Sequence, residues 1–195
     1  MLVFLVVFSY LLGSIPTALI VGKAGYGIDI RKQGSGNLGA TNTFRTLGVK
    51  AGIIVTVVDI LKGTTAGLLP VIFSVDINIL LIGLFASIGH SFPIFAKFKG
   101  GKAVATSSGV LLAYDYRIFL ITILIFIISL YLFKMVSLAS IISSVIIFIY
   151  ALIFSSSDII LLVVLGVLSI FVIYRHKENI KRIKNNTEPK IKWLG

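Results

Sequence analysis

The sequence contains no cysteine, only two histidines and few charged residues. Without cysteine the chain has no disulfide, no thiolate nucleophile and no thiolate-bound metal. A histidine metal site would rest on His90 and His176, which lie in quite different segments, so we expect no metal. Charged residues make up 13% of the chain and apolar residues 57%, with a mean hydropathy of +1.08, which is typical of an integral membrane protein.

Acidic residues are scarcer than basic ones, since 7 Asp and Glu stand against 18 Lys and Arg, a net charge of +11. Such a charge can indicate a nucleic-acid partner, but nearly all the basic residues lie beside apolar segments, so we expect no nucleic acid. Positive charge beside a membrane helix marks its cytoplasmic end. The first 23 residues lack the basic start of a signal peptide and stay apolar through Ile20 and Val21, which favours a retained membrane helix.

Long apolar segments predict an all-α, polytopic membrane protein of about seven transmembrane helices, forming one domain over residues 1–195. Basic residues gather in residues 23–50, around residue 100 and after residue 174, so we expect the N-terminus outside, with the C-terminus and the active site on the cytoplasmic face. Residues 103–114 span only about 18 Å of a ~30 Å hydrocarbon layer, so this helix begins inside the membrane or extends at its ends. The segments lie at about 1–22, 51–73, 77–96, 103–114, 118–133, 135–154 and 159–174.

The first polar stretch on the expected cytoplasmic face, GSGNLGATNTFR at residues 34–45, has the composition of a phosphate-binding loop. Its glycines permit positive φ, so backbone N–H groups can converge on an anion, and Arg45 offers a planar charged fork suited to phosphate. It lacks the GK[ST] of a Walker loop, and no strand precedes it as in a Rossmann fingerprint. An ordinary flexible membrane loop is the alternative. The candidate binding residues before Arg45 are Gly34, Ser35, Gly36, Asn37, Gly39, Thr41 and Asn42.

The second polar stretch, residues 89–102, ends in KFKGGK. Gly100 and Gly101 stand where the short helix is expected to begin, and a helix N-terminus offers unpaired N–H groups to phosphate. Lysines that merely meet lipid headgroups are the alternative. His90 is either a general base or a structural hydrogen-bonding residue. The candidate binding residues of this stretch are His90, Lys97, Lys99, Gly100, Gly101 and Lys102.

The third polar stretch, residues 175–188, carries the best-placed histidine. At helical spacing His176 and Asn179 share one face, with Arg175 and Arg182 nearby. Neighbouring cations favour the neutral imidazole, which suits a general base at pH 7. A basic tail at the membrane surface is the alternative, and it explains the lysines but not the pair of His176 and Asn179.

Two charged residues interrupt the second apolar segment, where Asp59 and Lys62 stand three residues apart and can therefore pair. Charges inside a membrane usually face a functional cavity, so Lys62 is a further candidate for binding phosphate, although it could also only brace the site, as could Asp29 and Arg31. Ser137 and Ser140 could reach the same site, and Ser140 is a candidate for binding phosphate, although serines in membrane helices commonly bond backbone carbonyls.

Together the three stretches are similar to those of the bacterial acyl-phosphate:glycerol-3-phosphate acyltransferase family, integral membrane enzymes that begin phosphatidic acid synthesis. The similarity lies in GSGNLGATNTFR (34–45), GHSFPIFAKFKGGKAVAT (89–106) and RHKENIKRI with Glu188 (175–188). Ala103 and Asn186 stand where the family usually has glycine. Because asparagine tolerates positive φ, we expect the change at Asn186 to be mild, whereas Ala103 is expected to stiffen the helix start.

The resemblance implies transfer of an acyl chain from acyl phosphate to the 1-hydroxyl of sn-glycerol 3-phosphate, giving lysophosphatidic acid and phosphate without a cofactor. It implies functional roles for Ser35, Arg45, His176 and Asn179, and a glycerol-phosphate site at residues 100–102. It also implies a bacterial cytoplasmic membrane protein that contacts lipid and couples to an enzyme producing acyl phosphate. Either His176 or a substrate phosphate takes the hydroxyl proton, and direct transfer is favoured over an acyl-serine at Ser35, which would need an activating base beside it.

The rival function is a membrane transporter of an organic phosphate, which would also use cytoplasmic cations and intramembrane charge. A transporter is expected to show internal repeats and a midplane site, but the sequence shows no repeat and its polar clusters belong to one face. The HxxxxD pattern of acyltransferases with soluble donors is absent after both histidines. The sequence therefore favours the acyl-phosphate enzyme.

Overall fold

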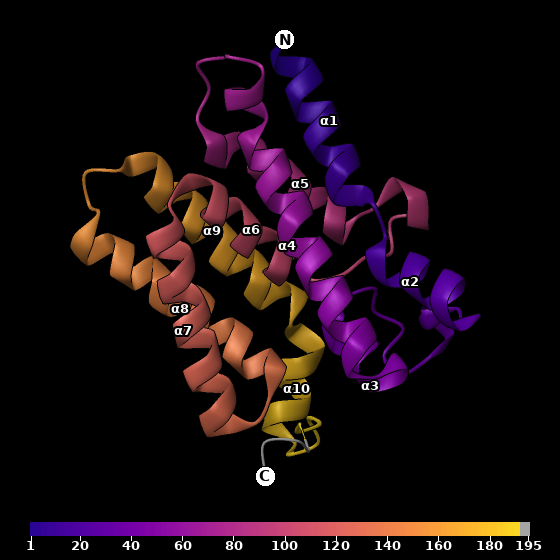
Figure 1. Ribbon diagram of the computed structural model, residues 1–195. Helices are drawn as coiled ribbons and strands as arrows, with labels where there is room; N and C mark the ends of the chain where they lie inside the picture. Colours follow the sequence, from indigo (N-terminus) through magenta and orange to yellow (C-terminus); the bar gives the residue numbers. More distant parts are fainter. Residues whose placement is uncertain (192–195) are drawn as a thin grey trace. The chain divides into compact units, whose positions relative to one another are not determined.

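A computed structural model describes residues 1–191, and every regular element in that part of the chain is helical (Figure 1), which confirms the predicted all-α class. The chain divides into two compact units, Met1–Tyr114 and a second one that begins at Asp115. The single domain over 1–195 stays a prediction.

Within the described residues, five segments are long and apolar enough to cross a membrane. A sixth is added if Ile159–Arg175 and Lys177–Lys184, which meet at a bend of 59°, count as one span. The short segment was correctly predicted, since Val104–Tyr114 has only 11 residues. Seven crossings and their orientation stay predictions. The five segments are Leu2–Tyr26, Val49–Ile72, Ile79–Ala96, Tyr116–Phe133 and Val136–Phe154.

The first unit is built around the long helix α4 (Val49–Ile72), which packs against α1 (Leu2–Ser14), α5 (Ile79–Ser91) and α6 (Val104–Tyr114). Glycines allow these helices to approach closely. A Cβ at Gly109 of α6 would collide with the carbonyl of Ile60 in α4, and one at Gly13 of α1 with the backbone of Ala86 in α5. Backbones therefore meet where Leu–Leu packing would keep them apart.

The polar part of the first unit lies away from the N-terminus (Figure 1). It comprises α2 (Thr17–Tyr26), the 3-10 turn η1 (Ile30–Lys32), α3 (Ala40–Leu47) and η2 (Ile94–Ala96). A small apolar cluster that includes Ile30, Leu38 and Val55 anchors this polar layer to α4. The fold thus holds the loops before α3 and before α6 on a buried base.

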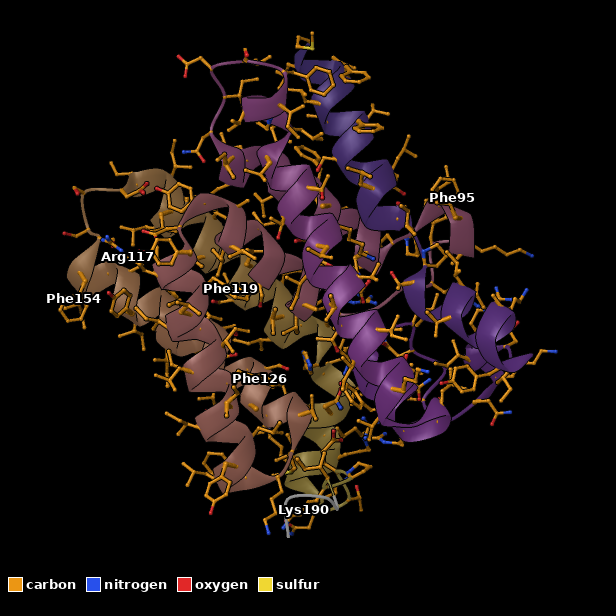
Figure 2. The ribbon with its side chains drawn as sticks, in the orientation of Figure 1. Phe95, Arg117, Phe119, Phe126, Phe154 and Lys190 are labelled. Carbon is orange, nitrogen blue, oxygen red and sulfur yellow. The ribbon has the colours of Figure 1, made fainter. Side chains whose placement is uncertain are left out.

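The second unit consists of α7 (Tyr116–Phe133), α8 (Val136–Phe154), α9 (Ile159–Arg175) and α10 (Lys177–Lys184), in which α8 packs against both α7 and α9. Asp115 and Asp158 cap the starts of α7 and α9 by accepting hydrogen bonds from the N–H groups of Arg117 and Leu161. Arg117 at the start of α7 and Phe154 at the end of α8 lie toward the same end of this pair (Figure 2), as an antiparallel hairpin requires.

Candidate active site

The loop before α3 has the backbone that its glycines predict at two of three positions. Gly34 and Gly36 have φ of 56° and 69°, in the left-handed region. Gly39 instead is extended, with φ −107°, because it is the N-cap of α3. Ser35 between the first two glycines is exposed.

The backbone N–H groups of this loop close the loop on itself. Ser35 N donates to Asn42 Oδ1 (2.9 Å), Gly36 N to the carbonyl of Gln33 (2.9 Å), and Gly39 N to Asn37 Oδ1 (3.0 Å). These three N–H groups were expected to converge on an anion, but in the structure they bond within the loop. Asn42, which is 2% exposed, and Asn37 accept two of these three bonds, since their side chains mimic backbone turns. Both residues shape the loop rather than face outward.

What the loop presents outward is side chains and the first turn of α3. Ser35 is exposed and Thr41 is half-buried, while the exposed Arg45 lies further on, in the last turn of α3. No Asp or Glu lies between residues 34 and 45 to repel an anion. The first N–H groups of an α-helix have no intrahelical partner and carry partial positive charge, so this end of α3 favours phosphate.

An ion pair braces the chain just before this loop. Arg31 Nη2 lies 2.6 Å from Asp29 Oδ2, and Asp29 also accepts from the N–H of Arg31. The hydrogen bond from the Arg31 guanidinium holds the pKa of Asp29 well below its usual value. This geometry favours bracing over substrate contact for both residues.

The glycines of the second loop pack against His90 at the end of α5. Gly101 N donates to the carbonyl of His90 (3.0 Å), a Cβ at Gly101 would collide with the His90 imidazole, and one at Gly100 with the His90 carbonyl. The Gly101 amide is thus occupied by the protein. His90 is buried, at 6% exposed, which favours the structural role over that of a general base.

The cradle was expected at a helix N-terminus, but α6 begins later, at Val104. Ala103 lies before the helix with φ 58°, and Asn186 of the second unit has φ 55°. Both positions where the similar family usually has glycine are therefore left-handed, which explains that preference. Ala103 strains the loop instead of stiffening the helix. The lysines expected to bind phosphate are outward, with Lys97 and Lys99 exposed and Lys102 half-buried.

One hydrogen bond joins the two loops of the first unit. Asn37 Nδ2 donates to the carbonyl of Gly100 at 3.3 Å. The polar stretches around residues 37 and 100, 63 positions apart in the chain, are thereby brought together. The hydrogen bond therefore holds the loop before α3 beside the loop that carries Lys97, Lys99 and Lys102.

The predicted pairing of Asp59 with Lys62 is present, with 2.8 Å between Nζ and Oδ1. The ammonium of Lys62 also donates to the carbonyl of Ile15 (3.0 Å), and the Lys62 side chain is only 5% exposed. Helix α1 ends just before Ile15, whose carbonyl also accepts from the N–H of Thr17 (3.0 Å). These contacts favour the bracing role for Lys62, and its role in binding phosphate stays a prediction.

His176 lies in the second unit at the bend between α9 and α10 and is 3% exposed. Its Nδ1 is 2.8 Å from the carbonyl oxygen of Val172. Because a carbonyl can only accept, Nδ1 carries the hydrogen and Nε2 carries the lone pair of the neutral ring. That tautomer is the one a general base at Nε2 needs.

Glu188 organises the same end of the second unit, a role that the sequence did not reveal. It accepts from Ser137 Oγ, Asn179 Nδ2 and Arg182 Nε, each at 2.7 Å. Burial raises the pKa of Glu188, but these hydrogen bonds and the charge of Arg182 outweigh it, and the pKa is lowered overall. The spacing of Asn179 and Arg182 on one helix face was the available signal.

Ser140 does not share in that network. Its hydroxyl donates to the carbonyl of Val136 at 2.8 Å, the alternative noted for membrane-helix serines. A role for Ser140 in binding phosphate stays a prediction.

Comparison with known proteins agrees with this description. The family model described as glycerol-3-phosphate acyltransferase matches residues 3–186. A curated glycerol-3-phosphate acyltransferase of Bacillus subtilis (strain 168) is 60% identical over 190 residues, which are 97% of each chain. One of Geobacillus kaustophilus (strain HTA426) is 55% identical over 187 residues, 96% of this chain and 94% of the relative.

Two solved structures share the fold. The glycerol 3-phosphate form of PlsY, an integral membrane glycerol 3-phosphate acyltransferase, aligns with a TM-score of 0.91 at 38% identity, covering 98% of this chain and 96% of PlsY. The lysophosphatidic acid form aligns with a TM-score of 0.88. A multi-pass helical membrane protein with these polar loops, matched along nearly its whole length, belongs to the glycerol-3-phosphate acyltransferase family.

Proposed function

We propose that this protein transfers an acyl chain from acyl phosphate to the 1-hydroxyl of sn-glycerol 3-phosphate, forming 1-acyl-glycerol 3-phosphate and inorganic phosphate. The observation that carries the proposal is the Asn37–Gly100 hydrogen bond, which joins the loop before α3 to the lysine-bearing loop before α6. Both substrates bring a phosphate, and the N-terminal end of α3 beside the lysines of the second loop matches that chemistry. The related structures were solved with glycerol 3-phosphate and lysophosphatidic acid, which supports the substrate and product.

The reaction needs positioning more than bond activation. The 1-hydroxyl oxygen attacks the carbonyl carbon of the mixed anhydride, the bond from that carbon to the phosphate oxygen breaks, and phosphate leaves with the electron pair. Cations such as Arg45 and Lys102 stabilise the departing charge. The hydroxyl proton passes to Nε2 of His176 or to a substrate phosphate. Holding both substrates in line supplies much of the rate enhancement.

The remaining assignments follow the same proposal. Ser35, Arg45, His176 and Asn179 are functional residues, the second loop binds glycerol phosphate, and the acyl chain stays in lipid. The polar loops face the cytoplasm of a bacterium, with the protein in its cytoplasmic membrane and supplied by an enzyme that makes acyl phosphate. No covalent acyl-serine is needed.

The test is product formation by purified protein from labelled glycerol 3-phosphate, with palmitoyl phosphate and palmitoyl-CoA offered in parallel. Labelled lysophosphatidic acid from palmitoyl phosphate alone is the expected result. Product from palmitoyl-CoA alone would refute the donor, whereas no product from folded protein with either donor would refute the reaction. In that last case phosphate flux in liposomes would test the rival transporter.

A further inference from the structure

Asp59 is a carboxylate in the middle of a membrane-spanning helix and is 1% exposed, and its role is not explained by the reaction. A charge buried there is costly and persists only when its partners compensate for it. Thr17 Oγ1 donates to Oδ1 of Asp59 (2.9 Å), and Lys62 Nζ lies 2.8 Å from the same oxygen. The carboxylate therefore connects α4 with the first turn of α2.

The second connection runs from Asp59 to α5. Nδ1 of His90 lies 3.7 Å from Oδ1 of Asp59, close enough for the buried charge to orient the imidazole ring. His90 is the residue on which the second loop rests, because its carbonyl accepts the Gly101 N–H and its ring fills the space beside Gly101. Gly100 in turn accepts from Asn37 of the first loop.

These contacts form one continuous series from the buried charge to both loops. We propose that Asp59 is a positioning residue, whose carboxylate orients His90 and thereby places the Gly100–Gly101 segment, and through it Asn37, for the phosphate of glycerol 3-phosphate. Asp59 touches no substrate. The inference rests on the proposed function, since it assigns Asp59 a part in binding the acceptor substrate.

The test compares full-length Asp59→Asn/Lys62→Gln with the wild type and with Asp76→Asn as a control. The double variant removes both charges together, because Asp59→Asn alone would leave Lys62 buried and uncompensated. Asp76 is an exposed acidic residue in the turn after α4, so its variant loses a charge without disturbing the series. Each protein is assayed for the KM of glycerol 3-phosphate, the KM of palmitoyl phosphate, and hydrogen exchange of residues 97–103.

In the double variant we expect the KM of glycerol 3-phosphate to rise about tenfold or more, because a charge-assisted anchor of the loop is lost. The KM of palmitoyl phosphate should stay within about twofold, and the Gly101 amide should exchange faster than in the wild type. If the double variant does not fold, Thr17→Val, which keeps the ion pair, takes its place. It should raise the KM of glycerol 3-phosphate about two- to threefold and speed exchange of the Gly101 amide.

Three results would overturn the proposal: an unchanged KM for glycerol 3-phosphate, an equal rise in both KM values, or unchanged exchange at residues 97–103 in a folded variant. A wild type that makes no product with either donor would refute the proposed function instead. Hydrogen exchange, which needs no turnover, would then still decide whether Asp59 holds the loop.

Discussion

At the scale of single residues, conformational requirements matter as much as chemistry. Gly101 is required by the imidazole beside it, and Ala103 and Asn186 occupy left-handed backbone without being glycine. Asn42 was predicted as a phosphate ligand, but its amide donates to the carbonyls of Ile30 and Gln33 and its oxygen accepts from Ser35. Whether a side chain such as that of Asn42 bonds within the protein depends on which backbone groups the fold brings near it.

Replacing Ala103 by glycine should stabilise the protein. A non-glycine residue at φ 58° costs about 1–2 kcal/mol relative to glycine. Part of this gain is lost on substitution, because glycine raises the conformational entropy of the unfolded chain. We expect Ala103→Gly to raise the free energy of unfolding by about 1 kcal/mol, measured by thermal unfolding in detergent. Ala105→Gly, inside α6, is the control and should lower it by about the same amount. Equal destabilisation by both would show that Ala103 is not strained.

Arg45 should act through its guanidinium fork. We expect Arg45→Ala to raise the KM for a phosphate substrate or abolish turnover, and Arg45→Lys to recover only part of the loss, since an ammonium cannot bind phosphate in a bidentate manner. The residue is exposed, so both variants should insert and melt like the wild type. Steady-state kinetics with unfolding controls decide this, and a variant that fails to fold would make Arg45 structural.

Glu188 should make stability depend on pH in a defined direction. Its folded pKa lies below the ordinary value of 4.5, so its contribution is fully present above about 4.5 and is lost as pH falls through the lower folded pKa. We expect Glu188→Gln to melt at lower temperature at pH 7, with the difference shrinking as pH drops below 4.5. Glu178→Gln, at an exposed position of α10, should show no such difference.

At the scale of helices, close contacts decide which glycines can be replaced. Gly109 lies against backbone atoms of Ile60 and Thr64 in α4, whereas Gly166 of α9 meets only the ring of Phe148, at 3.4 Å. Hydropathy alone does not indicate which of these two helical glycines can be replaced. The close crossing of α6 with α4 is what makes Gly109 the irreplaceable one.

We therefore expect opposite results from the same substitution at these positions. Gly109→Ala should destabilise by about 1–3 kcal/mol, because backbone cannot move aside as a side chain can. Gly166→Ala should be neutral or stabilise by up to about 1 kcal/mol through helix propensity. Thermal unfolding of the two variants in one detergent tests this, and equal effects would contradict the close approach of α6 to α4.

At the scale of the whole molecule, apolar runs predicted the class of protein and most of its helices. The described residues contain five segments able to cross a membrane, or six with the bent pair, where about seven were expected. Run length indicated the short helix correctly, but it could not locate the break after Ser14 or the bend of 59° at His176. At the first break, the carbonyl of Ile15 accepts from Lys62, a contact between residues far apart in the chain.

The predicted orientation can be tested because the chain has no cysteine. Single cysteines at Ser156, in the exposed loop between α8 and α9, and at Lys184, at the end of α10, mark opposite ends of the last apolar helix. If basic residues mark the cytoplasmic side, a membrane-impermeant maleimide should label Ser156→Cys in intact cells. Lys184→Cys should react only after permeabilisation. The reverse pattern would refute the orientation.

The sequence by itself determined the membrane class, the helical fold, the family and the polar stretches that carry function, because composition, run length and motif spacing are local properties. Only the tertiary structure decided what individual polar groups do. Asn37, Asn42, Lys62 and the Gly101 amide, all predicted to bind phosphate, hydrogen-bond within the protein. Asp59 and Glu188 each accept a hydrogen bond from a distant helix, through Thr17 and Ser137, which the sequence did not indicate. Hydrogen bonding depends on distance in space, which spacing along the chain does not specify.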